Sequence, residues 1–161
     1  MDTPLHTLVI GAGHAGLSMS RELQRRGLSH AVLERDRVGA SWRRRWDGFH
    51  LNTPGEINVL PDAEAPGEAG GFLSRDAWVA TLEDYVARHG LPVREGVEVR
   101  AVHPEGRGYA VETSQGSHYA DNVVLCSGDQ NAPRVPGVGR ESSHAIRAAC
   151  CPSDPRVRRA A

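Results

Sequence analysis

The chain has 161 residues, of which 39% are hydrophobic, and its formal net charge is −1. This length and composition predict one globular domain rather than a disordered chain. A nearly neutral charge gives no field that favours nucleic acid or a membrane surface, and no apolar run approaches the roughly 18 residues of a membrane span. The N-terminus lacks signal-peptide regions, and the three cysteines form neither a disulfide framework nor a zinc pattern, so we expect a cytoplasmic protein without a metal site.

The first predicted element is an apolar strand, Leu8 to Ile10, that runs directly into three glycines in G-x-G-x-x-G spacing. Between a strand and a helix this spacing is typical of the turn that binds a dinucleotide pyrophosphate. Gly11 permits a sharp turn, Gly13 lets the backbone approach the phosphates, and Gly16 lets the helix pack closely on the strand. The N–H groups at the helix start, including that of Ala15, would then face the negative charge.

A helix is predicted from about His14 to Arg26, and a short apolar strand, Ala31 to Leu33, follows it and ends at Glu34. Glu34 lies 18 residues after Gly16, close to the roughly 20 expected of an acid that binds the ribose of a dinucleotide. Its carboxylate can accept both ribose hydroxyls but repels a 2′-phosphate, so FAD or NAD fits better than NADP. The alternative is a surface glutamate that closes a strand end.

The segment from Arg35 to Arg45 is predicted to be a loop, because Gly39 and Ser41 interrupt any helical pattern. Its arginines either neutralise a pyrophosphate or form a solvated charged loop, and both interpretations stay open for Arg44 and Arg45.

Two tryptophans follow in this part of the chain, Trp42 and Trp46. They are costly to leave exposed, so at least one is expected to pack on a ring or in the core. Further along, a loop-rich insertion is expected at about 47–73. Within it, the prolines and glycines from Pro61 to Gly71 predict a loop that can act as a mobile lid.

Ser74 is a predicted helix N-cap, and the helix is expected to end at His89 and Gly90. Beyond Pro92 the period changes to short strands at 97–102, 109–113 and 117–119, separated by turn residues, which predicts an antiparallel meander.

The apolar run from Asn122 to Cys126 is expected to be a buried parallel strand. It ends at Ser127 and Gly128, where the chain can turn close to a ligand. Together these elements predict an α/β fold: a Rossmann-like parallel sheet with a βαβ dinucleotide-binding motif and a small antiparallel β-meander.

Four stretches of the chain form a recognisable set: Val9–Gly16; Leu33–Arg35 with Gly39–Trp42; Leu51–Pro54; and Val123–Gly128 with Pro133, Pro136 and Gly137. In this order they resemble the N-terminal FAD-binding region of the flavin-containing monooxygenase group, which includes Baeyer–Villiger-type monooxygenases. The third and fourth stretches are not shared by ordinary nicotinamide dehydrogenases. The resemblance therefore implies an FAD-dependent oxidoreductase over about residues 5 to 138.

The resemblance also implies roles for individual residues. The three glycines would hold the FAD pyrophosphate and Glu34 the ribose. Trp42 and Asn52 would lie toward the flavin end, and Val99 would meet the adenine through its backbone. The complete set of expected cofactor-binding residues is Gly11, Gly13, Ala15, Gly16, Glu34, Arg35, Ser41, Trp42, Asn52, Val99, Ser127 and Gly128. Cys126, just before the last two, is expected to be a buried small hydrophobe rather than a reactive thiol.

Members of this group reduce FAD with NADPH and oxygenate a substrate with dioxygen, and the cofactor supplies that chemistry. The second glycine motif, which receives NADPH in the group, is not found in this sequence. The resemblance is therefore to a truncated member, with an FAD-binding domain at 1–138 and an irregular or disordered tail at 139–161.

Four alternatives remain: a noncatalytic FAD-binding fragment, one half of a split enzyme that needs a partner chain, an NAD-binding Rossmann protein, and a structural domain whose glycine turn holds no ligand. No catalytic residue is identified from the sequence.

Overall fold

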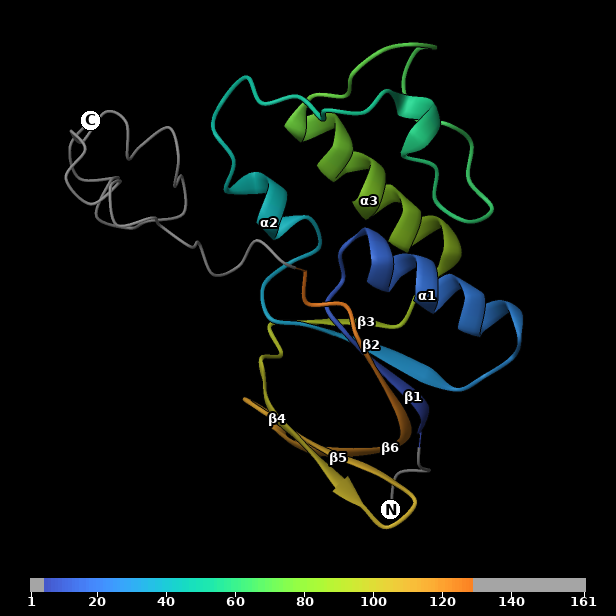
Figure 1. The fold of residues 1–161 in the computed structure, drawn as a ribbon, viewed down its shortest axis with the longest axis vertical. Coiled ribbons are helices and arrows are strands. Elements are labelled where there is room, and N and C mark those ends of the chain that lie inside the picture. Colours follow the sequence, from blue (N-terminus) through green and yellow to red (C-terminus); the bar gives the residue numbers. More distant parts are fainter. Residues whose placement is uncertain (1–4, 129–161) are drawn as a thin grey trace, which may run out of the picture.

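The structure is a computed structural model that describes residues 5–128, so the predicted tail at 139–161 lies outside the described residues. Its strands form one six-stranded sheet in the order β3-β2-β1-β6-β5-β4. Figure 1 shows the helices gathered beyond one end and one face of this sheet, with β4 and β5 curling away at the other end. The α/β fold with a mixed parallel and antiparallel sheet confirms the predicted class.

The βαβ unit forms as the glycine motif predicts. Strand β1 (Leu5–Ile10) leads into α1 (His14–Arg25), and β2 (His30–Glu34) returns parallel to β1, with Ile10 opposite Leu33. Helix α1 ends just before Gly27, whose φ of 65° gives the chain the left-handed residue that ends many helices.

The segment predicted to be a loop after Glu34 contains a short helix, α2 (Ala40–Arg43), so that prediction is wrong in part. Gly39 adopts a φ of 75° at its start, and Trp42 packs edge-on against Trp78 of α3, with ring centroids 6.4 Å apart. A tertiary contact therefore stabilises a helix too short to form by its own propensity. The loop-rich insertion carries a single 3₁₀ turn, η1 (Gly55–Ile57), and residues 61–71 contain neither helix nor strand, as expected.

Helix α3 (Arg75–His89) begins and ends where the sequence predicts. The Ser74 hydroxyl accepts a hydrogen bond from the Ala77 N–H at 3.2 Å, and Gly90 is left-handed with a φ of 57°. Among the described residues no helix has both the length and the apolar character that a membrane crossing requires.

Strand β3 (Val93–Glu95) is absent from the prediction. Its three residues alternate too briefly for a strand pattern, and it forms because β2 lies alongside, with Val32 opposite Val93. Strand β4 (Val99–Glu105) continues through Pro104, which was predicted to lie in a turn. Proline is tolerated in β4 because this strand lies at the edge of the sheet.

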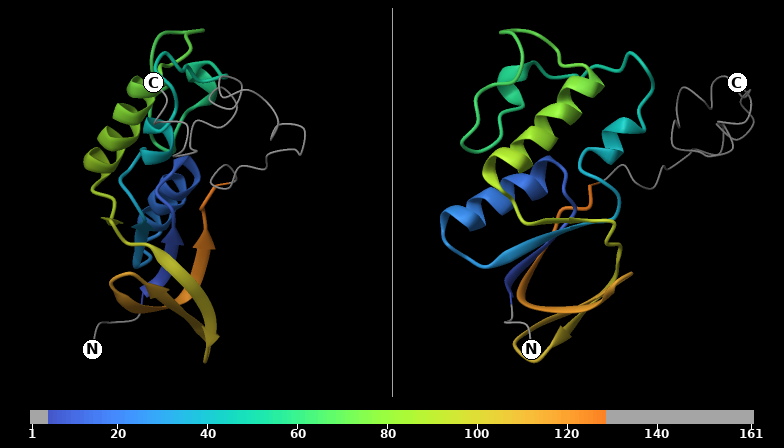
Figure 2. Two further views of the ribbon diagram at one scale, coloured as in Figure 1. Left: turned by 90° about the vertical axis from the view of Figure 1, so that its left-hand side faces the viewer. Right: turned by 180° about the vertical axis from the view of Figure 1, so that it is seen from behind.

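The predicted strands at 117–119 and 122–126 are one strand, β6 (Gly116–Leu125). Its first half pairs antiparallel with β5 (Gly108–Thr113), and its second half pairs parallel with β1. Ala120 serves both halves, because it lies opposite Tyr109 of β5 and Leu5 of β1. The meander and the parallel sheet are therefore continuous, and the two views in Figure 2 show the bend that β6 introduces.

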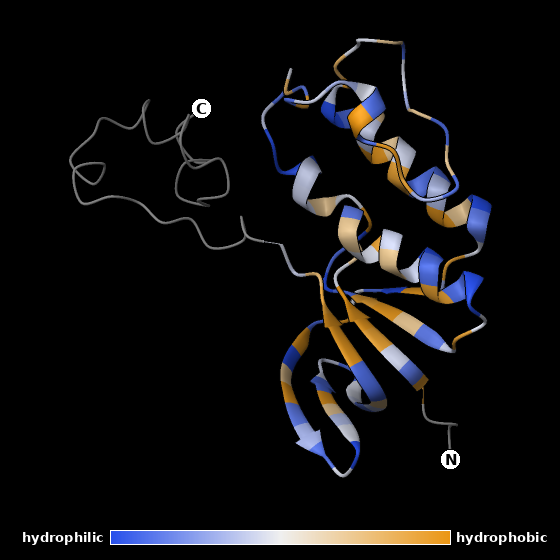
Figure 3. Cartoon of the chain, turned by 45° about the vertical axis from the view of Figure 1, so that its right-hand side comes forward, coloured by the Kyte–Doolittle hydropathy of each residue, from blue (hydrophilic) through white to orange (hydrophobic). Residues whose placement is uncertain are grey.

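Alternate residues of the central strands bury opposite faces of the sheet. Val9 and Val32 pack under α1 and α3 with Leu17, Trp78 and Leu82. Leu8 and Leu33 pack on the other face against Val111 and Ala120, where the meander folds over them. Figure 3 shows this as hydrophobic colour concentrated in the parallel strands. Burial on both faces is typical of parallel strands and fixes where their carboxyl ends emerge.

Candidate functional site

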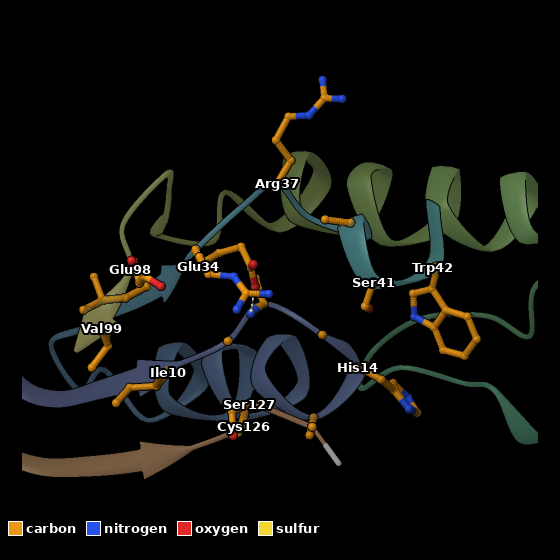
Figure 4. Close-up of a pocket in the computed structure, with 18 of the residues that line it drawn as sticks. Ile10, His14, Glu34, Arg37, Ser41, Trp42, Glu98, Val99, Cys126 and Ser127 are labelled. Atoms are coloured by element: carbon orange, nitrogen blue, oxygen red, sulfur yellow. Dashed lines mark hydrogen bonds between the residues drawn. The ribbon is translucent and has the colours of Figure 1, made fainter. Parts of the chain in front are cut away.

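A cavity of about 580 Å³ lies where β1, β2 and β6 end. Its walls are the β1–α1 turn, the end of β2 with the loop after it, α2, the start of β4 and the end of β6 (Figure 4). Ligands of open parallel sheets bind at this position, outside the carboxyl ends of the strands. The cavity is therefore the candidate site.

Two glycines of the turn are required by the protein itself. Gly11 has a φ of 102°, which other residues rarely adopt, and a Cβ there would overlap the Cys126 carbonyl. A Cβ at Gly16 would overlap the Gly11 carbonyl oxygen, so helix α1 approaches the turn closely only because this residue has no side chain. Gly16 lies behind the turn and does not line the cavity.

Gly13 differs from both. Its φ of −84° is open to any residue, and a Cβ there would have no atom of residues 5–128 within 4 Å beyond its two chain neighbours. Neither the backbone nor the packing of the described residues calls for glycine at this position. It is also the N-cap of α1, with no side-chain cap and no acidic residue in the first turn. An open space at an uncapped helix start fits an anionic group that approaches the backbone closely.

The carboxylate of Glu34 is held at the cavity wall by two backbone N–H groups. Ala12 N–H donates to Oε2 at 2.8 Å and Asp36 N–H donates to Oε1 at 3.0 Å. Figure 4 shows the side chain beside the turn, with one of these bonds dashed. Each oxygen keeps a further lone pair, so the carboxylate can accept two neighbouring hydroxyls.

Ten of the twelve expected cofactor-binding residues line this cavity: Gly11, Gly13, Ala15, Glu34, Arg35, Ser41, Trp42, Val99, Ser127 and Gly128. Gly16 supports the turn from behind. Asn52 is exposed and does not line the cavity, so the structure does not bring it to the other predicted residues.

The cavity wall also contains residues outside the predicted set, among them His14, Arg37, Glu98 and Cys126. His14 could have been found, because it lies inside the glycine motif, and Glu98 directly precedes Val99. Nothing in the sequence marks Arg37 apart from its charge.

The two arginines whose role was open both line the cavity. Arg44 donates to the Asp36 carboxylate at 2.9 Å, and this hydrogen bond is the main reason that the pKa of Asp36 is lowered. Arg44 is therefore already paired within the protein, which favours a positioning role over a free phosphate ligand.

The tryptophan expectation is met by Trp42, which packs between Trp78 and Phe49 and also lines the cavity. Trp46 is 53% exposed and contacts Phe49 edge-on. Trp78 itself is fully buried and contacts His14, so aromatic rings connect α1, α2 and α3 beside the cavity.

Cys126 is half-buried at the end of β6, and its N–H donates to the Ile10 carbonyl at 2.8 Å. Burial raises the pKa of its thiol, which disfavours the reactive thiolate. Within residues 5–128 no group of three or more histidine, cysteine, aspartate or glutamate residues is arranged to hold a metal ion.

The glycine turn, the open helix start and the strand-end acid of a βαβ unit surround one cavity here. This arrangement is typical of α/β domains that bind dinucleotides. The family model described as pyridine nucleotide-disulphide oxidoreductase matches residues 8–153, and the chain belongs to this family.

Individual relatives narrow the comparison. The chain is 33% identical over 130 residues to an uncharacterized CzcO-like oxidoreductase of Geobacillus kaustophilus. The alignment covers 80% of this chain and 37% of that protein. It is also 34% identical over 134 residues to the indole-3-pyruvate monooxygenase YUCCA1 of Oryza sativa subsp. japonica. This alignment covers 80% of this chain and 33% of the relative.

Among solved structures, a flavin-containing monooxygenase from Stenotrophomonas maltophilia superimposes with a TM-score of 0.78 at 29% identity, covering 84% of this chain and 42% of that chain. The predicted resemblance to the flavin-containing monooxygenase group is confirmed. The chain spans between a third and two fifths of the length of these curated relatives.

Proposed function

We propose that this chain binds FAD and is the FAD-binding part of an NADPH-dependent, flavin monooxygenase-like oxidoreductase. The observation that carries the proposal is Gly13: it is a glycine at the helix start that neither its backbone conformation nor its protein neighbours require. A ligand that lies against the backbone explains it, and the pyrophosphate of a dinucleotide is such a ligand.

In this proposal the N–H groups at the start of α1 hold the pyrophosphate. The carboxylate of Glu34, already fixed by two N–H groups, accepts the adenosine ribose hydroxyls. The backbone at Val99 lies beside the adenine, while Trp42 and the Ser127–Gly128 turn lie toward the flavin. Asn52 stays a predicted residue of the flavin end, although it does not line the cavity. FAD would supply the redox chemistry, with NADPH as the group's co-substrate.

A cytoplasmic location is part of the proposal, as is a partner chain that supplies the NADPH site for turnover. The narrower alternatives are a noncatalytic FAD-binding fragment and an NAD-binding protein. Similarity to a flavin-containing monooxygenase at 29% identity supports FAD over NAD.

The direct test is to purify the chain, denature it and record the spectrum of any released chromophore. We expect flavin, or flavin retention after reconstitution with FAD. Release of a nicotinamide nucleotide would contradict the FAD assignment, and failure to bind either would contradict a dinucleotide site. Consumption of NADPH in air would separate an enzyme from a noncatalytic fragment.

The variant Gly13→Val tests the carrying observation. Because a side chain here meets only open space, we expect FAD affinity to fall by about 100-fold or more, while the free energy of unfolding falls by no more than about 1 kcal/mol, the cost of a poorer N-cap. The matched control is Gly27→Ala, which is also without protein neighbours but has a φ of 65°. It should lower stability by about 1 kcal/mol and leave FAD affinity unchanged. Full FAD retention in Gly13→Val would overturn the assignment of the turn.

A further inference from the structure

The orientation of the Glu34 carboxylate depends on the loop that begins at this residue, and only part of that loop lines the cavity. We call residues 34–38 the acid loop. One oxygen of Glu34 is held by the Ala12 N–H of the glycine turn, and the other by the Asp36 N–H of this loop. The orientation of the carboxylate therefore follows the position of the Asp36 backbone.

Four contacts from distant parts of the chain hold the acid loop in place. On the β3–β4 side, Gly96 N–H donates to the Asp36 carbonyl at 3.0 Å and Val97 N–H donates to the Glu34 carbonyl at 2.9 Å. The side chain of Glu95 accepts the Val38 N–H at 2.8 Å. On the α2 side, Arg44 donates to the Asp36 carboxylate at 2.9 Å.

Two of these contacts use side chains, those of Asp36 and Glu95, and neither residue lines the cavity. Each is an acid near a site proposed to bind an anion, which is unfavourable unless the charge is compensated. Arg44 and Arg35 form ion pairs with Asp36, and the Glu95 carboxylate accepts a hydrogen bond from the Val38 N–H. The role of holding the acid loop explains why these two acids lie near the site.

We propose that Asp36 and Glu95 are positioning residues for the recognition of a ribose diol: they fix the acid loop so that the carboxylate of Glu34 meets two neighbouring hydroxyls. This inference rests on the proposed function, because the diol belongs to the adenosine part of the dinucleotide.

The physical reason is preorganisation. A free glutamate side chain rotates about three bonds, and ordering it on binding costs affinity. A hydrogen bond weakens steeply when its donor moves or tilts. If the acid loop loosens, the Asp36 N–H no longer fixes one oxygen of Glu34, and the ligand itself must order the carboxylate.

The test compares FAD affinity of the full chain and its variants by fluorescence titration. Asp36→Ala and Glu95→Ala should each weaken binding about tenfold, the factor that corresponds to one hydrogen bond of ordinary strength. Glu95→Gln should restore binding to within about twofold of the native chain, because its amide oxygen still accepts the Val38 N–H. The matched control is Glu112→Ala, which removes a β5 carboxylate that lies 3.3 Å from His103 Nε2 outside the cavity, and this variant should bind FAD normally.

Two further readouts separate positioning from general destabilisation. In a double-mutant cycle, Asp36→Ala should add little to Glu34→Gln, because both act through the same carboxylate. The native chain should also bind ADP more tightly than 2′-deoxy-ADP, and Asp36→Ala should reduce that ratio.

An unchanged ratio, or fully additive losses in the cycle, would overturn the positioning role while leaving FAD binding intact. If the native chain binds neither FAD nor ADP, the proposed function fails and this inference fails with it.

Discussion

The glycine turn (residues 11–16) and the acid loop (residues 34–38) meet at Glu34, but they are built in different ways. The turn is packed closely on itself: a Cβ at Gly16 would overlap the Gly11 carbonyl oxygen, and one at Gly11 would overlap the Cys126 carbonyl. Two hydrogen bonds also join the turn to β2, from the Gly11 N–H to the Leu33 carbonyl and from the Ala12 N–H to the Glu34 carboxylate. The acid loop has no such close packing and is held by hydrogen bonds with Arg44, Glu95, Gly96 and Val97, which lie elsewhere in the chain.

The difference teaches which changes should affect folding and which should affect binding. At Gly11 and Gly16 close backbone packing leaves no room for a side chain, so altering either residue costs stability, whereas Gly13 between them faces open space. A loop fixed by hydrogen bonds at the surface can loosen while the core stays folded. The following predictions use this contrast.

The largest effect is expected for Gly16→Val. Its side chain would overlap the Gly11 carbonyl oxygen, and that atom belongs to backbone that cannot move without breaking the turn. We expect the free energy of unfolding to fall by more than about 3 kcal/mol. Urea unfolding followed by far-ultraviolet circular dichroism measures it. A urea midpoint equal to that of the native chain would show that the turn is more deformable than its packing indicates.

Glu34→Ala should affect binding more than folding. It removes the carboxylate and leaves the Ala12 and Asp36 N–H groups without their acceptor, but the cavity admits water to them. FAD affinity should fall about 100-fold, as expected for lost hydrogen bonds to a charged group, and stability should fall by about 1 kcal/mol or less. Titration and urea unfolding of the same preparation give both values. A loss of folding free energy larger than the loss of FAD-binding free energy would contradict the contrast between the glycine turn and the acid loop.

Gly39→Ala tests the residue that follows the acid loop, where α2 begins. The glycine has a φ of 75°, and its Cβ would lie 2.9 Å from Val79 Cγ1 of α3. We expect a loss of about 1–2 kcal/mol from the left-handed backbone, plus the cost of this close contact. The matched control is Gly48→Ala, which has a φ of 76° and no atom within 4 Å. If thermal unfolding shows equal losses of stability in Gly39→Ala and Gly48→Ala, the Val79 side chain moves aside freely.

The smallest effect concerns pH. The hydrogen bond from Arg44 lowers the pKa of Asp36 below its usual 3.8. A carboxyl group with a lowered folded pKa stabilises the fold above its unfolded pKa, and this contribution is lost as the pH falls through the folded pKa. The melting temperature of the native chain should therefore exceed that of Asp36→Asn slightly at neutral pH, and the gap should narrow as the pH falls below about 4. A gap that does not narrow on acidification would contradict the ion pair as its source.

Much of the glycine turn and its surroundings could be predicted from the sequence, because the signals are local. The spacing of three glycines, the alternation of the flanking strands, the Ser74 cap and the position of Glu34 all act within a few residues. Local stereochemistry and hydrophobic periodicity specify such features. They were sufficient for the α/β class, for the glycine turn and for Glu34, whereas Trp42 and Val99 of the cavity wall were predicted only from the resemblance to the flavin-containing monooxygenase group.

The remainder was decided by tertiary structure. Strand β3 exists because β2 lies beside it, α2 because Trp42 packs on Trp78, and β6 continues because Ala120 pairs on both sides. The Asp36 N–H lies only two residues from Glu34, but Glu95, which holds the same loop at Val38, reaches it only after the chain has crossed from β2 to β3. Such contacts join residues far apart in the sequence, and single-chain patterns carry no record of them because hydrogen bonds and packing depend on distance in space.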